Sequence, residues 1–187
     1  MSNKVLIFKG KYSEKAKEIC DSMGYASSIY DFEQANSVKE KDTSLSRWEK
    51  QYPEYDRIFF AFDNGEKRVS AILDMQERRN GLCEYPFNTP CLRHMNIIYI
   101  SSEVEIGEGC MVEENVSIQA GTKIGVGSII EAGTVIGANC IIGEGCTIGS
   151  NCIIEDGCKI GAYCRIESDS CLHELFEIGS GSIINSN

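Results

Sequence analysis

The second half of the chain repeats an isoleucine at every sixth position. From Ile100 to Ile184, fifteen positions spaced by six hold thirteen isoleucines, and the two exceptions are Val112 and Leu172. A helix repeats about every 3.6 residues and an ordinary strand about every two, so neither explains a strict period of six. The repeat predicts a solenoid of short strands joined by tight turns, in which every isoleucine points inward.

Two further periodicities predict the turns and the number of faces. Four residues after each isoleucine the side chain is mostly small, as a corner requires. Glycine follows the isoleucine at 107, 125, 143, 161 and 179, so three hexads make one triangular coil and residues 100–187 make nearly five coils. Three residues after each isoleucine, glycine or asparagine dominates, and both tolerate the positive φ of a tight turn. These turn positions are Gly109, Asn115, Gly121, Gly127, Gly133, Asn139, Gly145, Asn151 and Gly157.

Residues 1–90 follow a different pattern. A helix is expected from Ser13, as its N-cap, to Gly24. A second helix is expected to end near Gly81, and Asp63 with Glu66 predicts a capping box at its start. Alternating strands and helices are typical of a small α/β domain with a parallel sheet. The expected strands are Lys4–Phe8, Ser28–Phe32 and Arg57–Phe62.

The charge of the chain argues against two classes of partner. It holds 28 acidic residues against 18 lysines and arginines, a net charge of −10. Such a surface repels phosphate backbones, so we expect neither nucleic acid nor an anionic membrane as a partner. We see no targeting segment and no apolar run long enough to span a membrane. We therefore expect a cytoplasmic protein whose ten cysteines stay reduced.

The cysteines of the repeat do not predict a metal site. A spacing of six puts consecutive members on different walls of the coil, whereas zinc ligands favour pairs two to four residues apart. We interpret them as small buried hydrophobic residues, and we predict no metal. A β-helix carbonic anhydrase would need three histidine ligands, and the chain has only His94 and His173. An ice-binding β-helix is rejected too, because the outward positions are Glu, Gly and Asn rather than ladders of Thr. The cysteines in question are Cys140, Cys146, Cys152, Cys158 and Cys164.

The hexad pattern resembles that of the left-handed β-helix acyltransferases. The whole chain is similar to the sugar O- and N-acetyltransferases of the sialic-acid O-acetyltransferase and bacillosamine-pathway N-acetyltransferase group. Two segments show the likeness: RIFFAFDNGEKRVSAILDM, with Asp63 and Asn64 in place, and LRHMNIIYISSEVEIGEG at the passage into the first coil. The resemblance implies a small Rossmann-like α/β domain in residues 1–90. A left-handed parallel β-helix of about five coils would follow in residues 91–187.

The resemblance also implies an activity. Relatives transfer an acetyl group from acetyl-CoA to an amine or hydroxyl of a nucleotide-linked sugar, and they form homotrimers with active sites between neighbouring prisms. The nucleotide sugar would bind at the carboxyl ends of the N-terminal strands. The residues implied there are Gly10, Asp31, Asp63 and Asn64. For the two aspartates, turn formation and helix capping are the alternative explanations.

The family's catalytic histidine aligns with Ala138 here, and its acidic neighbour aligns with Gly137, so both groups are replaced. The reaction still needs a base, because the attacking amine or hydroxyl must lose a proton. His173 lies two coils after Gly137 on the same wall, and Glu155 lies between them, with about 4.8 Å per coil. We predict His173 as the base and Glu155 as its orienting carboxylate, with a plain surface histidine as the alternative. Two functions remain open: a sugar acetyltransferase with a displaced or lost base, and a catalytically inactive β-helix module for binding or assembly.

Overall fold

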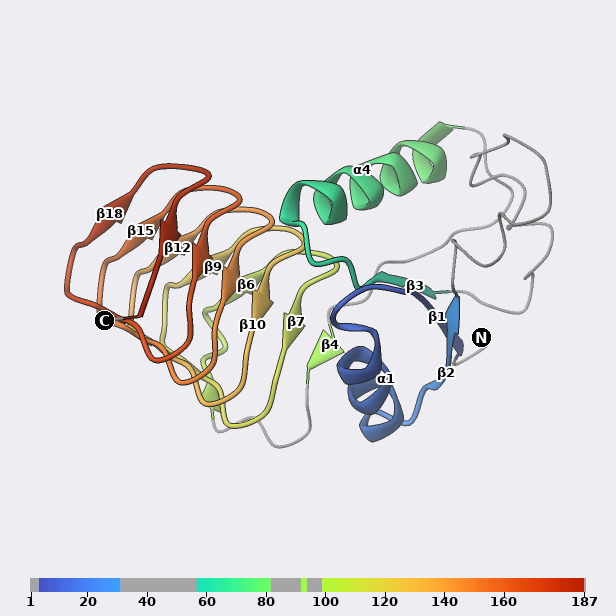
Figure 1. The fold of residues 1–187 in the computed structure, drawn as a ribbon, viewed down its shortest axis with the longest axis horizontal. Helices are drawn as coiled ribbons and strands as arrows, with labels where there is room; N and C mark the ends of the chain where they lie inside the picture. The colour runs from blue at the N-terminus through green and yellow to red at the C-terminus, as the bar shows by residue number, and fades with distance from the viewer. Residues whose placement is uncertain (1–3, 31–56, 82–91, 94–98, 187) are drawn as a thin grey trace.

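A computed structural model describes residues 4–30, 57–81, 92–93 and 99–186 of the chain (Figure 1). An α/β part formed by the N-terminal residues adjoins a long prism of stacked coils. Asp31 and His94 lie outside the described residues.

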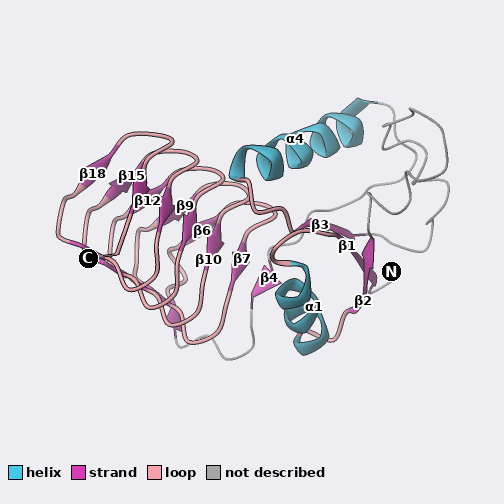
Figure 2. Ribbon diagram, in the orientation of Figure 1, coloured by secondary structure: helices cyan, strands magenta, loops and turns pink. Residues whose placement is uncertain are grey.

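The α/β part is a parallel sheet between two helices (Figure 2). Its strands, β1 (Lys4–Phe8), β2 (Ala26–Tyr30) and β3 (Arg57–Phe60), pair in the order β2-β1-β3. Helices α1 (Ser13–Ser22) and α4 (Gly65–Gly81) cover opposite faces of that sheet. The parallel sheet predicted from the element order is confirmed.

Alternation along β1 explains this layering. Val5 and Ile7 point to one face and pack with Ile19 of α1, whereas Leu6 and Phe8 point to the other face. Ile72 of α4 packs with this second pair. Successive side chains of a strand face opposite sides, so one apolar strand serves two separate layers of core.

Both helices start differently from the prediction. Ser13 is the first residue of α1 rather than its N-cap, which is Tyr12, and the Ser13 hydroxyl donates to the Gly10 carbonyl at 2.9 Å. At the start of α4, the Asn64 side chain accepts a hydrogen bond from the Lys67 amide at 2.8 Å. The residue just before a helix is the one whose side chain reaches the third amide, so Asn64 and not Asp63 is placed to cap α4. The capping box predicted at Asp63 is therefore wrong, and its carboxylate is available for other contacts.

The second half is a prism built from strands of two residues each. The strands stack into three walls: wall 1 (β4, β7, β10, β13, β16, β19), wall 2 (β5, β8, β11, β14, β17) and wall 3 (β6, β9, β12, β15, β18). Neighbours within a wall are parallel, and from β5 onward their paired residues are eighteen apart, as in the pairing of Ile130 with Ile148. This confirms the triangular coil of three hexads and fits a left-handed β-helix. The strands are β4 (Leu92–Arg93), β5 (Tyr99–Ile100), β6 (Glu105–Ile106), β7 (Met111–Val112), β8 (Ser117–Ile118), β9 (Lys123–Ile124), β10 (Ile129–Ile130), β11 (Val135–Ile136), β12 (Ile141–Ile142), β13 (Thr147–Ile148), β14 (Ile153–Ile154), β15 (Lys159–Ile160), β16 (Arg165–Ile166), β17 (Cys171–Leu172), β18 (Glu177–Ile178) and β19 (Ile183–Ile184).

The turns lie where the sequence predicts them. All nine glycine and asparagine turn positions have positive φ, from 55° at Asn151 to 74° at Gly121. In the later coils the same position holds Tyr163, Asp169 and Leu175, also with positive φ. The backbone of the coil is therefore kept even where the residue type does not favour it.

The corner residues form hydrogen bonds that the sequence analysis did not predict. Each corner thiol donates to the carbonyl oxygen fifteen residues later, as Cys146 does to Gly161 at 3.1 Å. Thr134 does the same to Gly149 at 2.8 Å. The thiols are buried as predicted, but they act as hydrogen-bond donors rather than as plain hydrophobic side chains. Cys110, Cys140, Cys152, Cys158 and Cys164 form the equivalent bond, each at 3.1 Å.

The N-terminal part packs onto wall 1. Met111 and Ile129, which point outward from that wall, are fully buried in one cluster with Val5, Ile7 and Phe59. The two halves of the chain therefore share a hydrophobic core.

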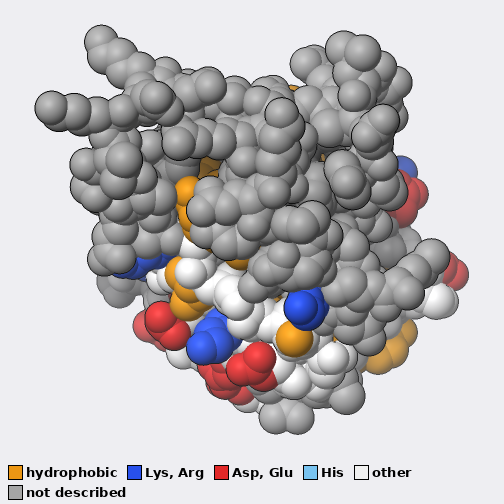
Figure 3. All heavy atoms as spheres, turned by 90° about the vertical axis from the view of Figure 1, so that its right-hand side faces the viewer, with side chains coloured by type: hydrophobic (Ala, Val, Ile, Leu, Met, Phe, Trp, Pro, Cys, Tyr) orange, Lys and Arg blue, Asp and Glu red, His pale blue; other side chains and the backbone are white. Residues whose placement is uncertain are grey.

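The described residues that show at the end of the N-terminal part away from the prism are of mixed type (Figure 3). Figure 3 views this end, where acidic, basic and hydrophobic side chains of the described residues lie close together. Within the described ranges, no helix has the length and apolar character needed to cross a membrane.

Candidate functional site

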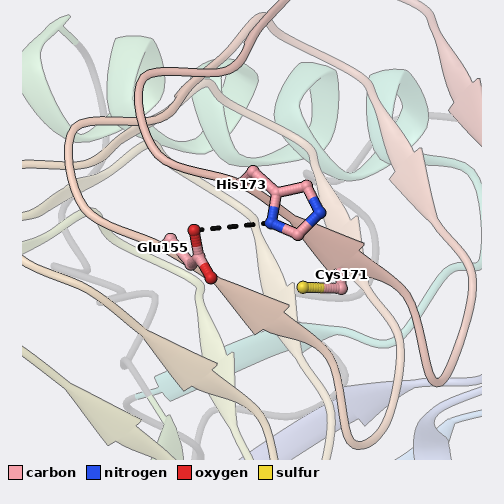
Figure 4. Close-up of side chains that lie close together, drawn as sticks. All are labelled: Glu155, Cys171 and His173. Atoms are coloured by element: carbon pink, nitrogen blue, oxygen red, sulfur yellow. Dashed lines mark ion pairs between the residues drawn. The ribbon is translucent and has the colours of Figure 1, made fainter.

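The structure places His173 beside Glu155 at the edge of wall 2. Strand β14 pairs with β17, so the residues that follow these strands are neighbours in adjacent coils. The Nδ1 atom of His173 lies 3.5 Å from Oε2 of Glu155 (Figure 4). The same carboxylate oxygen accepts a hydrogen bond from the Glu174 amide at 2.9 Å, which fixes the orientation of the carboxylate.

This pair is open to solvent. The His173 side chain is 82% exposed and that of Glu155 is 40% exposed, so their attraction contributes little to stability. The Glu155 carboxylate instead affects the chemistry of His173, because a carboxylate at Nδ1 favours the tautomer in which Nε2 can accept a proton. The geometry therefore suits a base and its orienting group, and the catalytic role itself stays a prediction.

Cys171 completes this cluster, and the sequence analysis did not single it out. It is exposed, unlike the buried corner thiols, and one ligand atom from each of Glu155, Cys171 and His173 lies within 4.8 Å of the others. The hexad register holds the signal that could have found it. Cys171 directly precedes the inward Leu172, so it occupies an outward strand position on the wall that also carries His173.

A second group of charged side chains surrounds Asp63. Its carboxylate lies 3.4 Å from Arg165 Nη1 on wall 1 and 3.9 Å from Lys11 Nζ in the loop after β1. Arg165 also pairs with Glu167 at 2.7 Å. Two cations and two carboxylates from distant parts of the chain thus meet beside the carboxyl ends of β1 and β3, the edge at which open α/β sheets bind ligands.

Gly10 follows β1 at this edge of the sheet. A Cβ atom there would lie 2.1 Å from the carbonyl oxygen of Ala61, far inside contact distance. Packing against the end of β3 therefore explains this glycine without a ligand.

Tyr12 joins this edge to the prism. Its hydroxyl donates to Glu131 at 3.2 Å, and the other oxygen of Glu131 accepts from Ser150 at 3.1 Å. Burial and the neighbouring Glu131 carboxylate raise the pKa of Tyr12 well above its usual range. The phenol therefore stays protonated and acts as a fixed donor.

Arg68 fixes the loop that carries Asp63. It is fully buried, and its guanidinium donates to the carbonyl oxygens of Phe62 at 2.7 Å and Asp63 at 2.8 Å. The same group reaches the prism, where it donates to the carbonyl of Gly127 at 2.8 Å and that of Gly145 at 3.2 Å. Burial lowers the pKa of Arg68, and these carbonyl dipoles take the place of a carboxylate partner. No local sequence pattern indicates the role of Arg68, because its hydrogen-bond partners in the prism are distant in sequence.

The predicted site residues therefore fall into two separate places. Gly10, Asp63 and Asn64 lie where the N-terminal part meets wall 1, and Glu155 with His173 lies at wall 2. A prism presents each wall in a different direction, so one copy of the chain does not bring all of the predicted residues together.

Comparisons with known proteins agree with this fold. The sequence model of a family described as the GMPPB C-terminal domain matches residues 94–187. No curated protein sequence matches the chain significantly.

Solved structures share the architecture of the whole chain. The acetyltransferase domain of PglB from Neisseria gonorrhoeae, in complex with acetyl coenzyme A, has a TM-score of 0.80 at 18% identity, over 100% of this chain and 89% of that chain. A mutant perosamine N-acetyltransferase from Caulobacter crescentus, in complex with CoA and GDP-perosamine, has a TM-score of 0.62 at 22% identity. The match covers 98% of this chain and 91% of that chain. WeeI from Acinetobacter baumannii has a TM-score of 0.77 at 14% identity, and the match covers 98% of this chain and 89% of that chain. The resemblance to sugar acetyltransferases is thereby confirmed at the level of the fold.

Proposed function

The chain belongs to the GMPPB C-terminal domain family. We propose that it is an acetyl-CoA-dependent acetyltransferase acting on an amine or hydroxyl of a nucleotide-linked sugar. The observation that supports this most is the shared architecture of the whole chain. The N-terminal part and the prism together match an acetyltransferase domain in complex with acetyl coenzyme A.

In this proposal, residues 1–90 form a Rossmann-like domain that binds the nucleotide sugar, and residues 91–187 form the β-helix. The parallel sheet and the charged group around Asp63 support this assignment. Lys11 and Arg165 supply positive charge for a diphosphate, and an arginine can form two parallel hydrogen bonds to one phosphate group. The remaining substrate-binding residues of the proposal are Gly10, Asp31 and Asn64.

His173 acts as the base. Its Nε2 accepts the proton of the attacking amine or hydroxyl while Glu155 holds the Nδ1 proton. The acceptor attacks the thioester carbonyl, a C–N or C–O bond forms, and the C–S bond breaks. The proton then passes from His173 to the departing thiolate of coenzyme A.

A homotrimer completes the site. Wall 1 is covered by the N-terminal part, and wall 3 carries the ion pairs of Lys123 with Glu105 and of Lys159 with Glu177. Wall 2 instead exposes an apolar ladder, defined here as Tyr99, Val135 and Ile153. An exposed apolar stripe of this kind favours contact with another copy. Such contacts would bring the His173 of one copy towards the Asp63 group of another.

A binding module without catalytic activity is the second candidate. Ala138 stands where the resemblance places the base, and its methyl side chain cannot accept a proton; its backbone amide donates to Asp156 at 2.7 Å. A prism that has lost its base could still bind the same ligands. Turnover separates this candidate from the enzyme.

Calorimetry with acetyl-CoA and with a GDP-linked amino sugar tests the binding that both candidates require. We expect saturable heats for both ligands. Lys11→Met should weaken binding of the nucleotide sugar about tenfold, since it removes positive charge that would face the diphosphate, and should leave acetyl-CoA binding unchanged. Lys159→Met, at an exposed lysine of wall 3, is the matched control. Absence of heat with both ligands would refute the proposal.

A further inference from the structure

The cluster of Glu155, Cys171 and His173 offers three different donor atoms around one point. It presents a carboxylate oxygen, a thiol sulfur and an imidazole nitrogen, all within 4.8 Å of one another (Figure 4). Cys171 and His173 lie on either side of the buried Leu172, and Glu155 comes from the preceding coil.

The backbone around this cluster is fixed. The Glu155 amide donates to the Leu172 carbonyl at 2.9 Å, which links the two coils at the cluster itself. The Cys158 thiol donates to the His173 carbonyl at 3.1 Å from inside the prism. The three side chains therefore project from a rigid frame and need only small rotations to converge.

The donor set and the spacing select a class of ion. Calcium and magnesium prefer oxygen ligands alone, whereas a mixed sulfur, nitrogen and oxygen set suits zinc. Zinc bonds of about 2.0–2.1 Å to nitrogen and oxygen in a tetrahedron place those two ligand atoms about 3.4 Å apart. The observed distance between His173 Nδ1 and Glu155 Oε2 is 3.5 Å.

We propose that Glu155, Cys171 and His173 bind a zinc ion at the edge of wall 2, with the fourth coordination position open to water or to a solute. The sequence analysis predicts no metal, because the cysteine ladder cannot form a site and the chain has two histidines. The site arises instead from an outward cysteine, which only the pairing of β14 with β17 brings next to Glu155.

This site has a consequence for the proposed reaction, although it does not depend on it. A zinc ion on Nδ1 leaves the ring proton of His173 on Nε2, so the metal-bound imidazole cannot accept a proton there. Zinc loading should therefore suppress any acetyl transfer that uses His173. Metal binding is measured without acetyl-CoA, so each proposal can fail while the other stands.

Titration of the metal-free full-length protein with cobalt(II) tests the site directly. Cobalt replaces zinc and gives an ultraviolet charge-transfer band only when a thiolate binds it. We expect this band at one cobalt per chain, and displacement of cobalt by one zinc, counted by plasma mass spectrometry after dialysis. Zinc that stays unbound, or a cobalt complex without the thiolate band, would overturn the proposal.

Variants locate the ligands. Cys171→Ser should abolish the charge-transfer band. His173→Asn and Glu155→Gln should each lower the affinity for zinc more than about tenfold. Cys152→Ser, which alters a buried corner thiol, should retain full zinc affinity. Cys171 and His173 are exposed and Glu155 is partly exposed, so thermal unfolding of these three variants should match that of the unaltered protein. A charge-transfer band that survives in Cys171→Ser would assign the thiolate elsewhere and contradict the proposal.

Discussion

At the residue scale, most corners of the prism are closed by one short side chain with a hydrogen to donate, whereas Val116 fills its corner with an apolar side chain. Cys146 bonds the Gly161 carbonyl, Ser128 bonds that of Gly143, and Thr134 bonds that of Gly149. Cysteine, serine and threonine are thus interchangeable there, because each satisfies a carbonyl that would otherwise be buried without a partner.

The corner thiols predict how stability changes at alkaline pH. Burial raises the pKa of Cys146 to about 12, so the folded chain keeps a proton that the unfolded chain loses near its ordinary value. The folded state binds more protons in that interval, and the free energy of unfolding must therefore fall as the pH rises through it.

Cys146→Ser removes this titrating group and keeps the donor. We expect the free energy of unfolding in urea at pH 7 to change by about 1 kcal/mol or less. Between pH 7 and pH 10 the free energy of unfolding of the variant should fall by about 1 kcal/mol less than that of the unaltered protein. Equal losses in both proteins would show that Cys146 does not hold its proton on folding.

The positions of most residues in the prism could be predicted from the sequence, because the six-residue period fixes which side chains point inward. The nine turn positions and the buried isoleucines follow from it directly. The roles of Asp63 and Cys171 do not, because capping depends on a shift of one residue and Cys171 depends on its neighbour in the next coil.

At the element scale, α4 is docked against the prism by close backbone contact. A Cβ atom on Gly65 would lie 1.9 Å from the Gly145 carbonyl oxygen, so the helix start and the coil corner meet without side chains between them. Arg68, one turn later, bonds carbonyls on both sides of this contact. The sequence analysis predicts the helix but not its docking, since these contacts join residues far apart in the chain.

Replacement of Arg68 tests this docking. Arg68→Met keeps the length of the side chain and removes every donor, which leaves buried carbonyl oxygens without partners. We expect the free energy of unfolding to fall by about 3–5 kcal/mol. Arg165→Met, at a more exposed arginine, should cost about 1 kcal/mol or less in the same urea titration. Similar losses in the two variants would contradict the proposed role of Arg68.

At the scale of the whole molecule, the three walls of the prism have different surroundings. Wall 1 lies under the N-terminal part, wall 3 is charged, and wall 2 carries the apolar ladder. The period of six predicts three walls of similar interior, but it does not predict which wall the N-terminal part covers. The separation of the two groups of predicted site residues follows from that placement.

A matched pair of substitutions tests assembly through wall 2. Ile153 is 49% exposed on wall 2, and Ile141 is 47% exposed on wall 3. Ile153→Lys places a charge in the proposed apolar contact and should convert the proposed trimer into monomers. Ile141→Lys should leave the trimer intact. Light scattering after size exclusion gives the mass of each species, and a monomeric unaltered protein would exclude the trimer.

An assay of acetyl transfer tests the proposed acetyltransferase activity most directly. Metal-free protein is incubated with acetyl-CoA and a GDP-linked amino sugar, and mass spectrometry follows the mass of one acetyl group on the sugar. We predict acetylated product, with kcat reduced at least about 100-fold in His173→Asn. Binding of both ligands without any product would identify a binding module, and full activity in His173→Asn would contradict the proposed role of His173 as the base.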